Sequence, residues 1–458
     1  MNVFLLSKYV IILRQILKVK VGKMKVVKEA ISSDYLSYKV DEDMVIYEGN
    51  FCIYLDKLYK CKGLIYYKIS PPTLISFEAK VIGRQGKDLE NIKDEYLEGT
   101  MEVHGYKPIP ITINNIHKNY IDGYISSGII QSKNKYVDYI DFHIINFDKK
   151  QGDLIKYDEK LFAGRMNLEV SGYEITIDKR YDYRKELYEE LMSENGSIIT
   201  HVGRIKRKDN KQFKSTYVLK LLDEISDSLS FLVGRYVGIC LVNGYDKEQN
   251  IFKLWKECRI TPFKYVPTWS DSIVNHNNIE KYISLMCRKL HDSYYGPALK
   301  HVIDWYIDSL DNNISIENNV VSIQIALETL SYVVLVEKNK LLSDRAYENN
   351  TASQNIRLLL QTCKVYYGKK ELSIFNNFIQ NKFDDGIDIF TYYRNTIVHP
   401  TRKRSRANLS IDDMWNILQI GTRYVELVCL HIINYKGEYS NRLKDRWYGE
   451  VELVPWNE

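Results

Sequence analysis

A change of hydrophobic periodicity near residue 270 constrains the fold of this 458-residue chain more than any other feature. Before it, apolar and polar side chains alternate, as in DFHIIN, where Phe142 and Ile144 alternate with polar neighbours. This spacing is typical of strands with one buried face. After it, most segments have the spacing of amphipathic helices, as in residues 411–435. The sequence therefore predicts an α+β protein, with a β-rich N-terminal region followed by an all-α helical bundle.

The segment around residues 262–278 holds two prolines and several turn residues, a composition typical of a linker or a helix start. We therefore expect a β-rich sensor or regulatory domain over 40–270 and a helical domain over 275–458, after an N-terminal extension over 1–39. The last long helix is predicted to begin with a capping box formed by Ser410 and Asp413.

The N-terminal extension contains an apolar run over residues 3–13, which Lys8 interrupts and which is too short to span a bilayer. Its positive charges follow the apolar run, whereas a secretory signal places them in front. We interpret it as a packed or poorly ordered extension, with Met24 as an alternative start. No membrane association is expected.

Net charge and cysteine usage restrict the possible functions. The formal charge of +5 is small, so nucleic-acid binding would require local clusters of basic residues. The seven cysteines are scattered without a C-x-x-C pair, which indicates neither a zinc site nor a disulfide framework. A reducing cytoplasm fits this usage best.

One short stretch, 391-TYYRNTIVHPTRKRSR-406, concentrates residues with catalytic potential. On a helix over 387–399, the apolar side chains form one stripe, and Arg394 falls inside it. An arginine there is costly unless its guanidinium is paired or reaches an interface. Pro400 ends the helix, so His399 is predicted at its exposed C-terminal end, with Asn395 on the same face.

Two interpretations of this stretch remain open. The Arg-to-His spacing alone is expected about once by chance in such a chain. A functional interpretation therefore depends on the neighbouring features: Asn395, the apolar stripe around Arg394 and the helix end at Pro400. In the structural interpretation, His399 is a helix-end residue favoured by the helix dipole, and the basic loop is merely solvated. In the functional one, the loop follows an RNA backbone with four basic residues: Arg402, Lys403, Arg404 and Arg406.

The motif 394-RNTIVHP-400 within a helical bundle resembles the HEPN superfamily, and in particular the ApeA-like HEPN proteins of bacterial antiphage defence. The resemblance extends to residues 343–360 and 439–456, and it covers the N-terminal half only in general character. It implies a metal-independent ribonuclease that works as a dimer and causes growth arrest or cell death when infection triggers it. The family motif falls on Arg394, Asn395 and His399.

These residue types suit RNA cleavage without metal or cofactor. In such a reaction the 2′-hydroxyl attacks its own phosphate, which leaves a 2′,3′-cyclic phosphate and a 5′-hydroxyl. We expect His399 to act as general acid or base and Arg394 to stabilise the phosphate charge of the transition state, with Asn395 orienting the imidazole. The proton that His399 moves stays open.

Glu328 is a possible supporting acid, because it lies on a helix that is apolar nearly all round. A buried carboxylate needs a partner, and Arg394 or Arg357 could provide it. A structural ion pair and a catalytic role are both open. No histidine has the spacing of a metal site, so none is expected.

The sequence thus supports two hypotheses of different class. The first is an endoribonuclease of abortive infection, gated by the N-terminal region. Its partners would be RNA, of which tRNA is one candidate, a second copy of the chain or a larger homo-oligomer, and a phage-derived trigger. The second is a non-catalytic HEPN module that binds RNA or dimerises.

Overall fold

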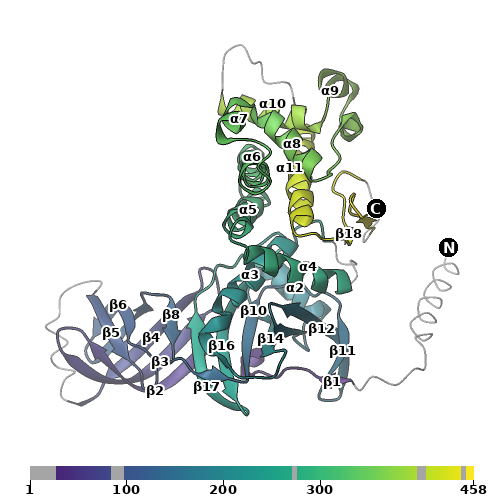
Figure 1. Cartoon of the computed structure of the whole chain (residues 1–458). Helices are drawn as coiled ribbons and strands as arrows, with labels where there is room; N and C mark the ends of the chain where they lie inside the picture. Colours follow the sequence, from purple (N-terminus) through teal and green to yellow (C-terminus); the bar gives the residue numbers. More distant parts are fainter. Residues whose placement is uncertain (1–26, 84–96, 271–275, 400–408, 445–449, 458) are drawn as a thin grey trace, which may run out of the picture.

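The computed structural model describes residues 27–83, 97–270, 276–399, 409–444 and 450–457. Two β-rich units lie side by side at the base of the molecule, and a column of helices stands on one of them (Figure 1). The coarse prediction of an α+β chain, β-rich first and helical afterwards, is confirmed. Met24 and most of the predicted extension fall outside the described residues.

The first unit is a closed six-stranded barrel, in which the strand order is β2-β3-β4-β7-β6-β5. Close backbone contact fixes two of its glycines. A Cβ on Gly63 would lie 2.0 Å from the carbonyl oxygen of Glu78, and one on Gly123 would lie 2.1 Å from that of Thr112. The strands are β2 (Met44–Tyr54), β3 (Leu58–Lys68), β4 (Leu74–Val81), β5 (Leu97–Glu102), β6 (Ile109–His117) and β7 (Tyr120–Ile125).

The second unit is a nine-stranded sheet with the order β1-β11-β12-β13-β14-β10-β16-β17-β8. Its strands are β1 (Lys28–Glu29), β8 (Ile129–Gln131), β10 (Tyr139–Ile145), β11 (Asp153–Tyr157), β12 (Lys160–Val170), β13 (Tyr173–Lys179), β14 (Ile199–Arg207), β16 (Gly238–Asp246) and β17 (Gln249–Lys256). A short pair, β9 (Tyr136–Val137) and β15 (Phe213–Lys214), flanks it. The predicted region 40–270 therefore contains two β units.

The central strand β10 is covered on both faces, whereas its alternation predicted one buried face. Phe142 and Ile144 pack into the core shared with the helices. The polar side chains of the other face, Asp141 and His143, are buried as well. His143 bonds Ser33, at the start of the 3₁₀ helix η1 (Asp34–Ser37) that follows β1, and Asp141 accepts two hydrogen bonds from Arg204 of β14. Polar residues in a strand can thus be buried when another segment satisfies their hydrogen bonds.

Two helices belong to the β-rich part. Helix α2 (Lys185–Glu194) ends at Asn195, which takes the left-handed conformation common at helix C-termini. Helix α3 (Leu219–Val233) follows the 3₁₀ turn η3 (Ser215–Val218) and lies beside α4 (His276–Leu290), where the helical column meets the sheet (Figure 1).

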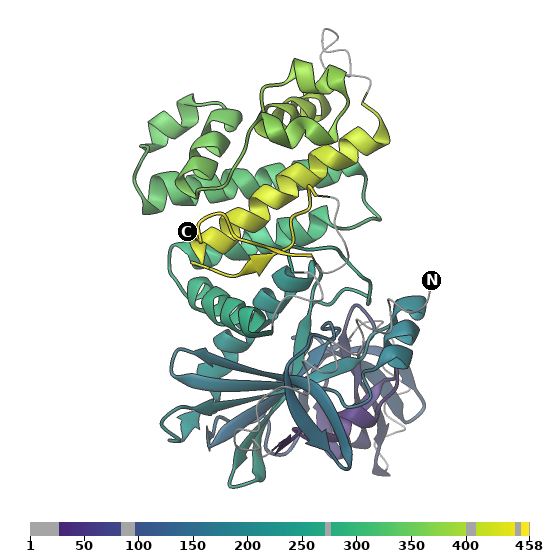
Figure 2. The same cartoon turned by 90° about the vertical axis from the view of Figure 1, so that its right-hand side faces the viewer.

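The helical column confirms the predicted helical C-terminal region. Pro297 lies in the first turn of α5, and Ser410 and Asp413 form the predicted capping box of α11. Figure 2 shows α11 crossing the whole helical part. The elements are α4 (His276–Leu290), α5 (Tyr295–Ser309), α6 (Ile316–Tyr332) with its π-helical continuation η4 (Val333–Lys338), α7 (Asp344–Asn349), α8 (Ala352–Thr362), the 3₁₀ helix η5 (Lys369–Ile374), α9 (Asn377–Lys382), α10 (Gly386–Val398), α11 (Ile411–Ile432), β18 (Glu438–Tyr439) and β19 (Glu452–Leu453).

Helix α4 begins at His276, inside the segment predicted as a linker or a helix start, and Trp269 before it is packed against the helical column. The fully buried Trp269 contacts Tyr282 of α4 and Tyr435, with ring centroids 4.7 and 5.6 Å apart. Its backbone N–H donates to Glu426 of α11 at 3.1 Å. One hydrophobic core therefore runs from the nine-stranded sheet through α3 and α4 into the column.

Candidate functional site

Helix α10 carries the predicted catalytic residues and lies at the end of the column farthest from the sheet (Figure 1). Its N-cap is Asp385, whose side chain accepts the N–H of Asp388 at 2.7 Å. The same carboxylate receives two hydrogen bonds from Arg357 of α8, at 3.1 and 3.0 Å. Arg357 thus fixes the start of α10, and it does not pair with Glu328 as we had considered.

A close approach of three helices holds the middle of α10. A Cβ on Gly421 of α11 would lie 2.4 Å from Cε2 of Phe390 and 2.7 Å from Cγ2 of Ile323 on α6. Only glycine allows α11 to come so near to α6 and α10 at once. Tyr393 is buried one turn further on, with its hydroxyl 2.6 Å from Sδ of Met414. The last turn of α10 is therefore anchored on its apolar side.

Arg394 is half-buried, as its position in the apolar stripe predicted. One terminal nitrogen, Nη1, donates to Oδ1 of Asn395 at 3.3 Å. The Nε–H is buried and has no acceptor among the described residues. An unsatisfied buried donor costs about 1–3 kcal/mol, so this guanidinium is set up to gain an acceptor.

His399 is the C-cap of α10, and its side chain is exposed. Its backbone N–H donates to the carbonyl oxygen of Asn395 at 3.0 Å. The side-chain oxygen of Asn395 contacts Arg394, so within the described residues Asn395 does not hold the imidazole as we had expected. The structure brings Arg394 and Asn395 together and leaves the ring of His399 facing solvent.

Glu328 is half-buried on α6 and accepts a hydrogen bond from Nε2 of Gln324 at 2.6 Å. Neither of the arginines considered for it is its partner, because Arg357 pairs with Asp385 and Arg394 contacts Asn395. A neighbouring amide one helical turn away therefore satisfies the carboxylate. The four basic residues of the predicted RNA-binding run, Arg402, Lys403, Arg404 and Arg406, lie outside the described residues.

A buried polar cluster at the N-terminal end of α10 was missed from the sequence. Nη1 of Arg423 on α11 donates to Oε1 of Glu371 at 2.9 Å, and the Tyr424 hydroxyl donates to Oε2. Glu371 is 7% exposed and Arg423 is 5% exposed. Burial raises the pKa of Glu371 to about 7, although the positive charge of Arg423 opposes this rise.

The sequence did contain a signal for such clusters, in the segment TRYVE of an otherwise apolar helix. The second charged residue of that segment, Glu426, forms a separate buried cluster. It receives hydrogen bonds from Arg442 at 2.8 and 2.7 Å and from the Tyr306 hydroxyl at 2.6 Å. Charges on the buried face of a long helix therefore indicated partners from distant segments, but not which ones.

Among the described residues, no group of three or more His, Cys, Asp or Glu side chains could hold a metal ion. In the same part of the chain, one helical stretch, Ile316–Lys338, is long and apolar enough to cross a membrane. However, 67% of its apolar window is buried inside the protein, as in a core helix.

Comparisons with known proteins give a family. The model of the YopA central domain matches residues 132–266, and that of the YopA C-terminal domain matches residues 292–453. A relative from Bacillus subtilis (strain 168), described as an SPbeta prophage-derived uncharacterized protein YopA, is 33% identical over 438 residues. The aligned part spans 93% of this chain and 98% of the relative. No solved structure matches the chain.

Proposed function

This chain belongs to the YopA family, and we propose its function from its own residues, because the Bacillus subtilis relative is described as uncharacterized. The proposed function is metal-independent cleavage of RNA at the C-terminal end of α10. The family descriptions name no activity, and the resemblance to HEPN nucleases stays a prediction. The proposed setting is the cytoplasm of an infected cell, where cleavage would stop growth and so limit the phage. The relative's prophage origin is consistent with a role in phage biology.

The state of Arg394 carries this proposal. Its guanidinium is half-buried beside Asn395, and one buried N–H lacks an acceptor among the described residues. A structural arginine in such a place normally has a carboxylate partner, as Arg357 and Arg423 have here. A phosphate oxygen would supply the missing acceptor, and the planar guanidinium suits phosphate geometry.

The chemistry then follows from what each side chain offers. Arg394 would stabilise the negative charge that grows on the phosphate oxygens while the 2′-hydroxyl attacks. His399 would move the proton of the attacking or the leaving oxygen, since an imidazole can act as general acid or base. Asn395 would orient Arg394, with which it already shares a hydrogen bond.

A second copy of the chain would complete the site. Arg394 and His399 lie at different positions around the axis of α10, and Arg394 bonds Asn395 and not the ring of His399. Two α10 helices related by a two-fold axis would place the arginine of one copy near the histidine of the other. Each site would then contain residues of both chains.

The test is cleavage of RNA, including tRNA, by the purified protein in the presence of a metal chelator. We expect 5′-hydroxyl ends, which polynucleotide kinase labels without prior phosphatase treatment. Arg394→Ala and His399→Ala should each lower the rate about 100-fold or more. Arg345→Ala and His301→Ala remove the same residue types from exposed positions of the helical part and should leave the rate unchanged. Equal rates in all five proteins would refute the proposal.

Mixing the two inactive variants tests the shared site. A dimer of one Arg394→Ala chain and one His399→Ala chain has one intact site if each site combines both chains. Random mixing makes half of the dimers mixed, so about a quarter of the wild-type activity should return. No recovery from demonstrably mixed dimers would show that each site belongs to a single chain.

The second candidate is a non-catalytic module in which Arg394 serves an interface. The exposed ring of His399 without a partner among the described residues favours it, since such a ring is also expected at an ordinary helix end. In that case Arg394→Ala would change the oligomeric state on a sizing column or weaken RNA binding. His399→Ala would then have no effect on either.

A further inference from the structure

We propose that the cavity at the N-terminal end of α10 binds a nucleoside monophosphate and that its occupation alters the position of α10. Binding of the nucleotide does not depend on the proposed nuclease function, whereas a role of this binding in regulating cleavage rests on that function. The cavity lies between η5, α11 and the segment after β18, and its volume is about 380 Å³. That volume falls within the range of roughly 300–1,000 Å³ typical of small-molecule sites.

The cavity offers hydrogen-bond donors and positive charge. Lys370, on its rim, is exposed and has no partner among the described residues. Arg423 lies at the floor, and its buried Nε–H also lacks an acceptor there. The one buried carboxylate, Glu371, is already bonded by Arg423 and Tyr424. The donors of Lys370 and Arg423 that have no acceptor therefore favour an anion, and a phosphate in the cavity would be near both side chains.

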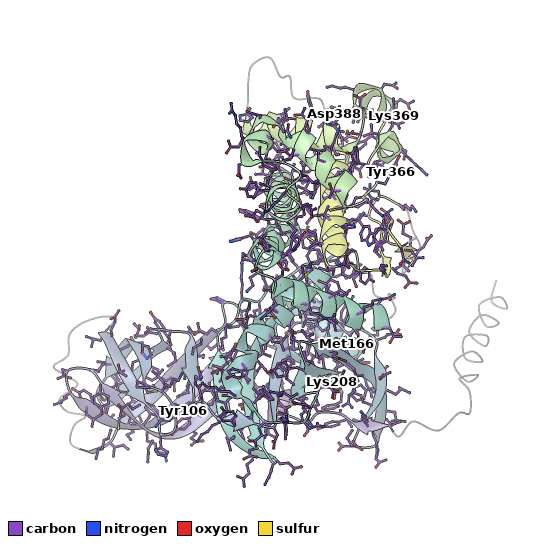
Figure 3. All side chains as sticks on the ribbon, in the orientation of Figure 1. Tyr106, Met166, Lys208, Tyr366, Lys369 and Asp388 are labelled. Carbon is purple, nitrogen blue, oxygen red and sulfur yellow. The ribbon has the colours of Figure 1, made fainter. Side chains whose placement is uncertain are left out.

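One wall of the cavity suits a flat ring. Tyr366 is 52% exposed, a high value for a large aromatic residue, and Ile374 and Leu443 line the same cavity. Figure 3 places Tyr366 on the flank of the helical column, below Lys369 and on the side of the C-terminal segment. Stacking of a base on an aromatic side chain contributes about 1–3 kcal/mol. A phosphate and a flat ring together describe a nucleotide.

The floor of the cavity touches the beginning of α10. A Cβ on Gly386, the first residue of α10, would lie 2.5 Å from Oε2 of Glu371 and 2.5 Å from the Tyr424 hydroxyl. A ligand that draws Arg423 towards its phosphate must therefore shift groups in direct contact with this helix. The 13 residues of α10 form a rod of about 20 Å, and Arg394 lies in its last two turns.

Binding is measured first, by calorimetry on the full-length protein without RNA. The probes are the four ribonucleoside 5′-monophosphates, with adenosine and inorganic phosphate as the separate halves of the ligand. We expect at least one monophosphate to bind at least about tenfold more tightly than either half. Lys370→Ala and Tyr366→Ala should each weaken binding about tenfold, while Lys369→Ala, an exposed neighbour outside the cavity, should not.

No binding of any monophosphate at about 1 mM would overturn the proposal, and so would equal losses in Lys369→Ala and Lys370→Ala. Binding of phosphate alone, unaffected by Tyr366→Ala, would refute the nucleoside part. The His399→Ala variant should bind the monophosphate as tightly as the wild type. Nucleotide binding and RNA cleavage are thus measured separately, and a negative cleavage assay leaves the binding result valid. The shift of α10 is tested by amide hydrogen exchange, because the bound nucleotide should change the exchange rates of residues 386–398. Unchanged rates would refute the coupling.

Discussion

Lowering the pH from 7 to 5 should destabilise this protein through His143. The ring is 1% exposed. Its Nδ1 lies 2.6 Å from the carbonyl oxygen of Leu241, and its Nε2 lies 2.7 Å from Oγ of Ser33. A carbonyl can only accept, so the proton of the neutral ring belongs on Nδ1, and Nε2 accepts the hydroxyl of Ser33. Burial lowers the pKa of His143 to about 4, because the charged form loses its hydration.

The sign and the size of the effect follow from linkage. In the unfolded chain the pKa of this side chain is about 6.5, so between pH 6.5 and 4 the unfolded state binds more protons than the folded state. The free energy of unfolding must then fall as the pH falls. For these two pKa values, the contribution of His143 changes by about 2 kcal/mol between pH 7 and pH 5.

Urea unfolding at both pH values measures this change. In His143→Asn the side-chain amide can still donate to Leu241 but cannot be protonated, so the loss of stability on acidification should be smaller than in the wild type by about 2 kcal/mol. His117→Asn makes the same substitution at an exposed position and should keep the wild-type dependence. His201, whose pKa burial also lowers, contributes to all three proteins alike. An identical pH dependence in the wild type and His143→Asn would refute the reasoning.

Three further predictions concern α10 and the loop after it. Gly421→Ala should lower the free energy of unfolding by about 1–3 kcal/mol in chemical denaturation, since its Cβ would overlap Phe390; unchanged stability would contradict the close approach. Asp385→Ala should lower the free energy of unfolding by about 1–2 kcal/mol, because the N-cap of α10 is lost. Amide hydrogen exchange in the first turn of α10 should then be faster than in the wild type. Arg402→Ala and Lys403→Ala should each reduce the slope of log affinity for RNA against log salt by about 1, and an unaltered slope would place them outside the interface.

The secondary structure could be predicted where a local rule decides it. Ser410 and Asp413 predict the capping box of α11. The apolar stripe of α10 predicts both the extent of this helix and the partial burial of Arg394. The exposed end of the helix at His399 followed from the proline behind it. Each of these features depends on residues within one or two helical turns, so spacing and residue type were sufficient.

The partners of the charged residues could not be predicted, because they come from distant parts of the chain. Arg394 and Arg357 were both candidate partners of Glu328, but Arg357 pairs with Asp385, 28 positions along the chain, and Gln324 satisfies Glu328 from one turn away. Arg423 reaches Glu371 across 52 positions. Several carboxylates are chemically equivalent partners for any arginine, and only the packing of the helices selects among them.

Trp269 changes how the N-terminal half could control α10. A sensor joined by a flexible linker could act by moving away, but here Trp269, next to the domain boundary, is buried against Tyr282, Tyr435 and α11. Separating the halves would expose this aromatic cluster together with the apolar faces of α3 and α4, which would cost the hydrophobic stabilisation of that surface. Any signal from the β-rich part must therefore pass through the continuous core as a shift in helix packing. The route is short. Helix α11 contacts Trp269 through Glu426, and it contacts α10 through Gly421, five residues earlier in the same helix.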